Sequence, residues 1–348
     1  MESTSADTQT GRPFSPLQAL AQLNPYVWST GLFMRGFALI KAADHLADGP
    51  RTAAELAEAT GTHAPSLARF LRACALHGLV TWVGKDRYEL TELGQLVRSD
   101  VPSLRSFVIA VNGPGMTRVW EHLVDVLKTG EPASKQALGM DHWEWYEANP
   151  EEGRYYAECN GLLTVEAAHV IAASYDLSQV TRIVDVGGSP GALLAGALKA
   201  APQATGVLFD LPAAVRNAEK TFAEQGLTDR LELVSGDFMT SVPEGGDLYL
   251  VKNILCDLDD TSAATLLRNC LAAMAPGGRL LLLDWIYTDT PSFVHATDVE
   301  FMVLTGGRGR TLDEYRQLLV DAGFAPPERV QLRGFEMAPF IVLEAARP

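Results

Sequence analysis

The chain has 348 residues, of which 47% are hydrophobic, and a formal net charge of −15 at pH 7. This length can bury a large core and suggests two domains, while the acidic balance argues against nucleic acid or another polyanion as a partner. The four cysteines are scattered without a C-x-x-C pair, which fits a reducing compartment, so we expect a cytoplasmic protein.

The N-terminus carries neither a basic start nor an apolar signal segment. Residues 1–12 are polar and rich in Ser and Thr, and we expect them to form a disordered tail. The uncharged stretch from Pro13 to Met34 contains Asn, Gln, Ser and Pro residues, which makes it a poor membrane span. We therefore predict packed helices here and no association with a membrane.

Residues 13–103 are predicted to form a winged-helix-like domain, because two helix signals precede a hairpin signal. In chain order, these are a capping box at Thr52–Glu55, a helix over Ser66–His77 between Pro65 and Gly78, and a hairpin that joins Leu79–Val83 to Arg87–Leu90.

This pattern also occurs in DNA-binding regulators, which makes such a regulator a minor alternative. Residues 51–100 contain six acidic and six basic residues, and the helix that would read DNA offers only Arg69 and Arg72. A DNA-reading module carries a basic face, so we expect no nucleic-acid partner.

Residues 104–180 are predicted to be helices that join the two parts of the chain. They contain enough aromatic surface to enclose a planar ligand, although core packing explains the same residues. The relevant side chains are Met116, Trp120, His142, Trp143, Trp145, Tyr146, Tyr155 and Tyr156.

A glycine-rich turn opens the C-terminal α/β part, residues 181–348. Arg182–Val186 is predicted to be a buried strand, and Ala192–Ala200 a helix. Between them Gly187, Gly188 and Gly191 allow a ligand to approach the backbone closely. Position 186 is valine, so the G-x-G-x-x-G dinucleotide pattern does not fit, and no G-K-[ST] follows for a phosphate loop.

Polar residues mark the carboxyl ends of the predicted strands. Asp185 lies inside the first strand, Asp210 ends the second, Asp237 ends the third (Leu231–Phe238), and Lys252 ends the fourth. Open α/β sheets bind ligands at this edge, and Asp210 can hold two ribose hydroxyls. Near the C-terminus, a capping box at Thr311–Glu314 starts a helix that ends at Gly323, and Arg329–Leu332 with Phe340–Glu344 forms a predicted hairpin.

Six ordered motifs between residues 20 and 345 resemble the class I S-adenosylmethionine-dependent O-methyltransferases of the plant caffeate type and their bacterial natural-product relatives. They are V-D-V-G-G at 184–188, F-D-L-P at 209–212, S-G-D-F at 235–238, K-N-I-L-C-D-L-D-D at 252–260, P-G-G-R-L-L-L-L-D at 276–284 and T-G-G-R-G-R-T at 305–311.

The resemblance implies an α/β fold, with a Rossmann-like C-terminal domain, a mostly α-helical N-terminal dimerisation domain and a homodimer. It also implies S-adenosyl-L-methionine as the cofactor, held by Asp185, Gly187, Gly188, Asp210, Leu211, Asp237, Phe238 and Lys252. The acceptor would be a small aromatic or polyketide-like molecule, bound by His142, Trp143, Tyr156, Asn160, Phe301 and Met302. Interface residues would come from Tyr26, Trp28, Leu32, Phe33, Met34 and Phe37.

The chain departs from the family at the residues that handle the substrate proton. The family's L-H-D motif has a histidine base where this chain has Cys256. The two acids that flank that histidine fall on Asp284, a shorter acid, and on Gly309, which has no side chain. Candidate catalytic residues are therefore Cys256, Asp257, Asp284 and His295, with His142 as another possible base. The Asp257 charge would raise the pKa of the Cys256 thiol and oppose its use as a base.

The acids Asp257, Asp259 and Asp260 are of a type that binds metals, but Asp259 and Asp260 precede a helix, where acids cap free N–H groups, so we expect no metal. Methyl transfer can proceed without a base, because holding the two reactants in line lowers the reaction barrier by about 7–11 kcal/mol. The sequence therefore predicts methyl transfer, most simply to a hydroxyl oxygen. The alternative is a homologue that binds the same cofactor and catalyses hydroxylation, decarboxylation or cyclisation.

Overall fold

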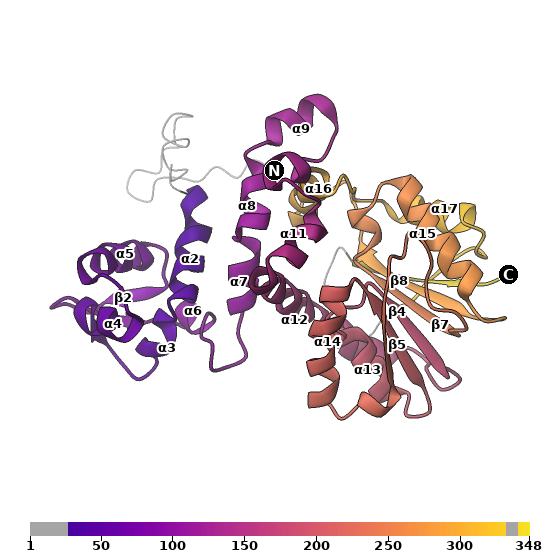
Figure 1. Ribbon diagram of the computed structural model, residues 1–348, viewed down its shortest axis with the longest axis horizontal. Coiled ribbons are helices and arrows are strands. Elements are labelled where there is room, and N and C mark those ends of the chain that lie inside the picture. The colour runs from indigo at the N-terminus through magenta and orange to yellow at the C-terminus, as the bar shows by residue number, and fades with distance from the viewer. Residues whose placement is uncertain (1–26, 332–339) are drawn as a thin grey trace, which may run out of the picture. The chain divides into compact units, whose positions relative to one another are not determined.

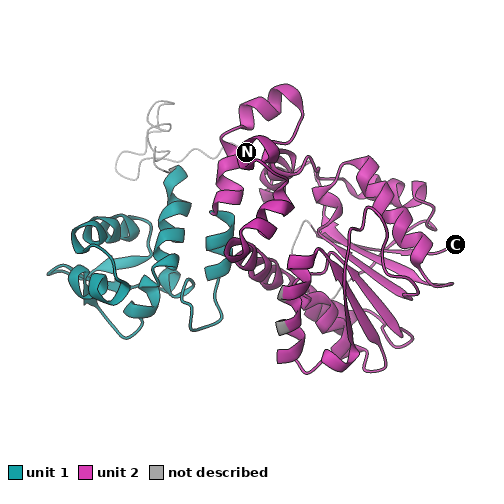
Figure 2. Cartoon of the chain, in the orientation of Figure 1, with its two compact units in different colours: residues 1–112 teal, residues 113–348 magenta. Residues whose placement is uncertain are grey.

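The computed structural model of this protein describes residues 27–331 and 340–348. The predicted tail over residues 1–12 and the predicted interface residue Tyr26 lie outside these residues. The chain divides into two compact units, residues 1–112 and 113–348 (Figure 2). The helices over 114–174 belong to the same unit as the sheet, and the predicted boundaries at 103/104 and 180/181 stay predictions.

The first unit contains the predicted pair of helices followed by a hairpin. Its elements are η1 (Val27–Ser29), α2 (Thr30–Leu39), α3 (Ala42–Leu46), β1 (Arg51–Thr52), α4 (Ala53–Thr60), α5 (Ala64–Leu76), β2 (Val80–Trp82), β3 (Arg87–Leu90), α6 (Glu92–Gln95) and α7 (Arg105–Val111). The strands form a small sheet in the order β1-β3-β2.

The local signals in this unit are confirmed. The Thr52 hydroxyl accepts the Glu55 N–H at 3.2 Å, and Glu55 accepts the Thr52 N–H at 2.7 Å, which completes the capping box of α4. Strands β2 and β3 pair antiparallel, with Val80 opposite Leu90. Among the predicted interface residues, Phe37 is fully buried in the core, whereas Trp28 and Leu32 are exposed.

The second unit begins with helices and continues into the α/β sheet (Figure 1). The helices before the sheet are α8 (Pro114–Trp120), α9 (Leu123–Thr129), α10 (Ser134–Leu138), α11 (His142–Ala148) and α12 (Pro150–Ser174). The strands are β4 (Arg182–Val186), β5 (Thr205–Asp210), β6 (Leu231–Ser235), β7 (Leu248–Lys252), β8 (Arg279–Trp285), β9 (Glu328–Arg329) and β10 (Phe340–Ala346). Between them lie α13 (Ala192–Ala200), α14 (Pro212–Glu224), η2 (Thr228–Arg230), η3 (Leu255–Asp257), α15 (Asp260–Ala273), α16 (Phe293–Leu304) and α17 (Leu312–Asp321).

The seven strands have the order β6-β5-β4-β7-β8-β10-β9, which confirms the Rossmann-like prediction. Strands β4 to β8 are parallel, and β10 runs antiparallel to both β8 and β9. The carboxyl ends of β4, β5, β6 and β7 therefore meet at one edge, where the candidate cofactor residues lie.

Helices cover both faces of the sheet because its strands alternate between two hydrophobic cores. Ile183 packs with α12, α13 and α14, and the next residue, Val184, packs with α15 and α17 on the opposite face. Parallel strands buried on both faces require this three-layer arrangement (Figure 1). None of the helices within the described residues has the length and apolar character needed to span a bilayer.

The third strand is shorter than predicted. The sequence suggested a strand through Asp237, but β6 ends at Ser235. The Asp237 carboxylate accepts the Met239 N–H at 2.8 Å, and this local hydrogen bond turns the chain away from the sheet. The C-terminal hairpin forms with β9 at Glu328–Arg329, and Leu332 of its predicted first strand lies outside the described residues.

Candidate functional site

The glycine turn after β4 packs so closely on neighbouring side chains that it has no room for side chains of its own. Gly187 has a φ of 68°, in the left-handed region, and its N–H donates to the Phe209 carbonyl at 2.8 Å. A Cβ at Gly187 would lie 2.5 Å from Ile254 Cδ1, and a Cβ at Gly188 would lie 2.4 Å from Asp185 Cγ. Both positions therefore need glycine, and the turn presents bare backbone.

The side chain of Asp185 packs against this turn at Gly188. It is 1% exposed, and its Oδ2 atom has no hydrogen-bond partner among the described residues. Burial, and then the charge of Asp210, raise the pKa of Asp185 to about 7, while the Leu194 N–H opposes the shift. Asp185 thus stays protonated at pH values well above those at which a carboxyl group ordinarily ionises.

Asp210, at the end of β5, is fixed by backbone donors. Its Oδ2 accepts the Ser189 N–H at 3.0 Å, and its Oδ1 accepts the Leu211 N–H at 2.7 Å. Burial raises the pKa of Asp210, and these two N–H groups oppose the shift. Each carboxylate oxygen can accept further hydrogen bonds, so the geometry suits a ligand with neighbouring hydroxyl groups.

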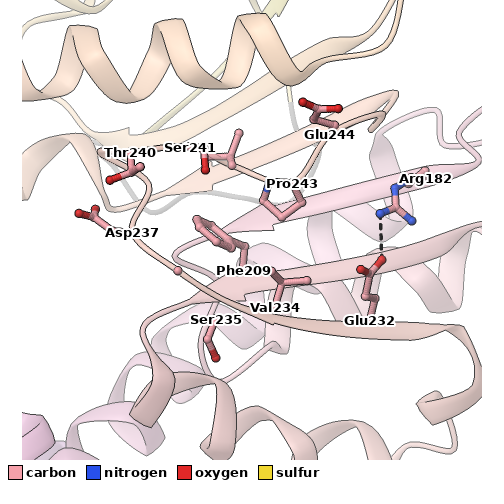
Figure 3. Close-up of a pocket in the computed structure, with 12 residues that line it drawn as sticks. Arg182, Phe209, Glu232, Val234, Ser235, Asp237, Thr240, Ser241, Pro243 and Glu244 are labelled. Carbon is pink, nitrogen blue, oxygen red and sulfur yellow. Dashed lines mark hydrogen bonds and ion pairs between the residues drawn. The ribbon is translucent and has the colours of Figure 1, made fainter.

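A groove of about 550 Å³ runs along β5 and β6 and reaches Asp237 at one end (Figure 3). At its other end Arg182 pairs with Glu232 at 2.9 Å. Asp237 is the only predicted cofactor residue in its lining, while Phe238 packs partly buried against the core. Gly187 and Asp210 are not among the residues that line this groove.

Lys252 ends β7, close to three acidic groups. Burial lowers its pKa, while Asp284, Cys256 and Asp185 oppose that shift. The next residue, Asn253, has a φ of 52°, an uncommon conformation outside glycine that marks backbone strain at this strand end.

Cys256 is not suited to accept a proton. It is 1% exposed, and burial, followed by the Asp284 and Asp257 charges, holds the pKa of its thiol well above the usual range. The neighbouring Asp284 is fully buried, and burial raises its pKa to about 6. Asp284 Oδ1 accepts the Trp285 N–H at 2.8 Å, whereas the thiol and the Tyr315 hydroxyl face the carboxyl group without a standard hydrogen bond to Oδ2.

Gly309, where the resemblance places the second family acid, lies against an aromatic ring. A Cβ at Gly309 would lie 2.6 Å from Tyr287 Cδ2, so no side chain fits there. The Tyr287 hydroxyl donates to Asp298 Oδ2 at 3.2 Å, and the Gly309 N–H donates to the other oxygen of the same carboxylate. Contacts with Tyr287 and Asp298 thus surround the backbone at Gly309.

The two candidate histidines have different surroundings. His295 Nδ1 accepts the Ser292 N–H at 3.1 Å and thereby caps α16, and its ring packs edge-on against Tyr287 at 4.4 Å. His142 is 1% exposed, and burial lowers its pKa to about 4. A ring with so low a pKa holds a proton poorly at neutral pH.

The acids after Cys256 have structural partners. Asp259 caps α15 by accepting the Ser262 N–H at 2.7 Å, as the sequence predicted. Asp260 pairs with Arg308 at 2.9 Å and with Arg310 at 2.8 Å. Among the described residues, no group of three or more His, Cys, Asp and Glu side chains is arranged to hold a metal ion.

The predicted acceptor residues form an aromatic cluster on α11 and α12. Tyr146 stacks on Tyr156 with ring centroids 4.4 Å apart, and Trp143 packs edge-on against Tyr156 at 5.9 Å. His142 packs edge-on against Tyr146 at 5.0 Å. Asn160 follows one helical turn after Tyr156.

On α16, the two predicted acceptor residues differ from each other in their surroundings. Met302 packs into a hydrophobic cluster with residues of α8, α9 and α10, which gives it a packing role, and Phe301 is partly buried without belonging to that cluster.

Glu300 is a candidate site residue that sequence reasoning missed. Burial raises the pKa of its carboxyl group to about 7, and its charge raises the pKa values of Asp257 and Tyr146. The available signal was an acid between apolar residues of α16, next to the predicted Phe301. It was missed because a single acid on a helix is ordinarily explained as a solvated face.

The residues of the glycine turn, together with Asp185, Asp210 and Asp237, fit S-adenosylmethionine. The turn at Gly187 and Gly188 would collide with any added Cβ, and the unpartnered Asp185 Oδ2 atom lies beneath it. The fixed Asp210 carboxylate can accept ribose hydroxyls, and Asp237 follows at the next strand end. These are the features of a nucleoside site at the carboxyl ends of parallel strands.

Comparisons with known proteins agree with this geometry. The family model described as the O-methyltransferase domain matches residues 120–325, and the O-methyltransferase dimerisation domain matches residues 37–100. The second match supports the predicted homodimer and assigns the winged-helix-like module a role in dimerisation.

Three curated relatives resemble the chain over most of its length. Phenazine O-methyltransferase PhzM from Lysobacter antibioticus is 34% identical over 83% of this chain and 85% of its own. O-demethylpuromycin-O-methyltransferase from Streptomyces alboniger is 38% identical over 85% of this chain and 80% of its own. Aclacinomycin 10-hydroxylase RdmB from Streptomyces purpurascens is 33% identical over 85% of this chain and 81% of its own.

The solved structures include a relative with both ligands bound. It is NcsB1, an O-methyltransferase from neocarzinostatin biosynthesis in complex with S-adenosylmethionine and 2-hydroxy-5-methyl naphthoic acid. The two structures have a TM-score of 0.80 and 31% sequence identity, and the match covers 96% of this chain and 99% of that chain. On these matches and the site geometry, the chain belongs to the S-adenosylmethionine-dependent O-methyltransferase family.

Proposed function

We propose that this protein methylates a hydroxyl oxygen of a small aromatic or polyketide-like natural product without a histidine base. The observation that carries the proposal is the pairing of an intact cofactor-type turn at Gly187 and Gly188 with a buried, protonated thiol at Cys256. The relatives named for phenazine, puromycin and naphthoate chemistry support an aromatic or polyketide acceptor.

S-adenosylmethionine, when bound, supplies an electrophilic methyl group. Asp210 would hold the ribose hydroxyls, because its two oxygens are already oriented by the Ser189 and Leu211 N–H groups. Gly187 and Gly188 would admit the ligand close to the backbone. Leu211, Asp237, Phe238 and Lys252 complete the proposed cofactor site.

The acceptor would be positioned by the aromatic cluster of Trp143, Tyr146 and Tyr156, whose rings exclude water and orient a planar molecule. Positioning can contribute about 7–11 kcal/mol, whereas a general base contributes about 10²–10⁴-fold in rate. The enzyme is therefore expected to be slow with ordinary alcohols and to favour phenols, whose protons are more acidic.

A second candidate function is a non-methylating reaction on the same cofactor scaffold. It is favoured by the absent histidine base and by the similarity to a relative named as a hydroxylase. Hydroxylation, decarboxylation and cyclisation are the reactions to test.

We also propose a cytoplasmic location, supported by four free and buried cysteines. Trp28 and Leu32, exposed on the first unit, are proposed to contribute to the dimer interface.

The test is calorimetric titration with S-adenosylmethionine and S-adenosylhomocysteine, followed by mass spectrometry of reactions with phenolic acceptors. A methylated product together with S-adenosylhomocysteine supports the proposal. Binding with product formation but no loss of the methyl group supports the second candidate. No binding of either ligand refutes both.

A further inference from the structure

Two buried side chains on α11 have polar atoms without a partner. His142 is 1% exposed and Tyr146 is 7% exposed. Neither His142 Nδ1 nor the Tyr146 hydroxyl makes a hydrogen bond with any residue that the structure describes. A buried polar atom without a partner is costly, so folded proteins pair nearly all such atoms with protein groups, water or a ligand. These two exceptions therefore call for a partner from outside the chain.

The two side chains lie next to each other. They are four positions apart on α11, which places them on the same face of the helix. Their rings meet edge-on, with centroids 5.0 Å apart. A single planar molecule bound at this face can therefore contact both side chains.

The other polar groups at the start of α11 have partners within the chain. Asp141 accepts the Trp143 N–H at 2.9 Å, and Glu144 accepts the Asp141 N–H at 2.9 Å. The Trp145 indole N–H donates to Glu152 at 3.0 Å. At this end of the helix, the missing partners are thus confined to the two side chains that pack into the aromatic cluster.

Partly exposed rings adjoin the buried pair. Helix α11 packs on α12 (Figure 1), and Tyr156 of α12 stacks on Tyr146 with centroids 4.4 Å apart. Trp143 meets His142 edge-on at 5.1 Å. Both Trp143 and Tyr156 are partly exposed. Each buried side chain is therefore in ring contact with an accessible one, and a planar ligand that displaces an accessible ring reaches the buried pair.

Both buried groups are uncharged at neutral pH. Burial lowers the pKa of His142 to about 4, and burial, followed by the Glu152 and Glu300 charges, raises the pKa of Tyr146 well above its usual range. A neutral imidazole nitrogen donates or accepts according to its tautomer, and a phenol hydroxyl does both. A ligand hydroxyl also donates and accepts, so it matches this pair in either tautomer.

We propose that His142 and Tyr146 bind a second hydroxyl group of the acceptor, other than the hydroxyl that is methylated. The acceptor then belongs to the uncharged aromatic compounds with at least two hydroxyl groups. This inference rests on the proposed function, because it assigns a chemical class to the acceptor of that same site. The alternative partner is a buried water molecule, and the experiment distinguishes the two.

The experiment compares naphthols with one and two hydroxyl groups on the full-length protein saturated with S-adenosylhomocysteine. The probes are 2-naphthol and the 1,3-, 1,6- and 2,7-isomers of dihydroxynaphthalene. By calorimetry at pH 7.5, at least one of these isomers should bind about tenfold more tightly than 2-naphthol, which corresponds to one or two hydrogen bonds between neutral groups.

Variants locate the effect. Tyr146→Phe removes only the hydroxyl, so the preference for the dihydroxy probe should fall to about threefold or less, with the affinity for 2-naphthol within about twofold of the wild type. His142→Phe should act in the same way. Tyr88→Phe is the matched control, because it removes another buried hydroxyl without a partner among the described residues, in the first unit, and it should keep the full preference.

Thermal melts of the ligand-free protein separate binding from a structural role. Tyr146→Phe should not lower Tm, because the hydroxyl that it removes has no partner among the described residues. A lower Tm together with an unchanged preference would assign this hydroxyl to a buried water molecule and overturn the inference. If His142→Phe does not fold, Tyr146→Phe decides the question alone.

Equal affinity of the wild type for 2-naphthol and all three dihydroxynaphthalenes would also overturn the inference, as would a preference that survives substitution of either residue. Absence of S-adenosylhomocysteine binding would refute the proposed function instead. The same probes on the ligand-free protein would then decide the hydroxyl inference by the same criteria.

Discussion

Replacing Asp210 by asparagine tests the proposed ribose site with little change in shape. Both carboxylate oxygens accept backbone N–H groups, from Ser189 at 3.0 Å and from Leu211 at 2.7 Å. An asparagine has one acceptor oxygen, so its NH₂ group must face one of these two donors. The folded protein should lose about 1–3 kcal/mol, the cost of leaving one buried donor unpaired.

Asp210→Asn should also weaken cofactor binding, because the ribose hydroxyls would lose a charged acceptor. A hydroxyl that donates to a charged acceptor contributes about 1.5–3 kcal/mol, so the removal of one such bond weakens binding about 10- to 100-fold. Calorimetry with S-adenosylhomocysteine at pH 8 measures this directly, and circular dichroism confirms that Asp210→Asn is folded. Asp229→Asn, at an exposed carboxylate in η2, is the control and should bind like the wild type. An Asp210→Asn variant with an affinity within about twofold of the wild type would remove Asp210 from the cofactor site.

Three further substitutions test separate parts of the site. Asp185→Asn should raise Tm at pH 8 more than at pH 5. The folded carboxyl group, with a pKa of about 7, keeps a proton that the unfolded chain releases near pH 4, so wild-type stability falls by up to about 1.4 kcal/mol per pH unit between pH 4 and pH 7. Parallel profiles of Tm against pH for the two proteins would contradict this. Cys256→Ala should lower kcat/KM by less than about tenfold, similar to Cys270→Ala in the core, and a loss above about a hundredfold confined to Cys256→Ala would show that the thiol acts as a base. Gly309→Glu should destabilise the protein by about 1–3 kcal/mol in thermal melts, because Tyr287 fills the space beside Gly309. It should not raise kcat/KM. A rise in kcat/KM, for Gly309→Glu alone or together with Cys256→His, would show that this position can hold an acidic side chain after all.

The strands and the glycine turn that carry the proposed cofactor residues could be predicted from sequence because their signals are local. The strand Arg182–Val186, the glycines after it and Asp210 at the next strand end lie within 30 residues, and parallel pairing brings both strand ends to one edge. Helix ends were predictable for the same reason: the capping boxes of α4 and α17 depend on residues three positions apart.

The acceptor half depends on contacts between distant segments, which no local pattern encodes. Met302 on α16 packs with residues of α8, α9 and α10, and the separations in sequence exceed any helical or strand period. His295 is predicted to be a possible base, and this role stays a prediction, while its Nδ1 caps the helix that carries it. The titration behaviour of His142 and Glu300 follows from burial, which sequence alone does not reveal.

The departures from the family pattern are structurally coupled. Gly309 leaves room for the Tyr287 ring, and the Asp298 carboxylate joins the Tyr287 hydroxyl to the Gly309 N–H. The neighbouring Gly307 packs so closely on Cys256 that an added Cβ would lie 2.2 Å from its carbonyl oxygen.

The Tyr287 ring and the Asp298 carboxylate surround Gly309, so an acidic side chain restored at this position would disturb both. A base that acts through an imidazolium needs a nearby carboxylate to stabilise the charge, and here the place of that second acid is occupied by an aromatic ring. A Cys256→His variant would therefore lack the second carboxylate that this mechanism uses.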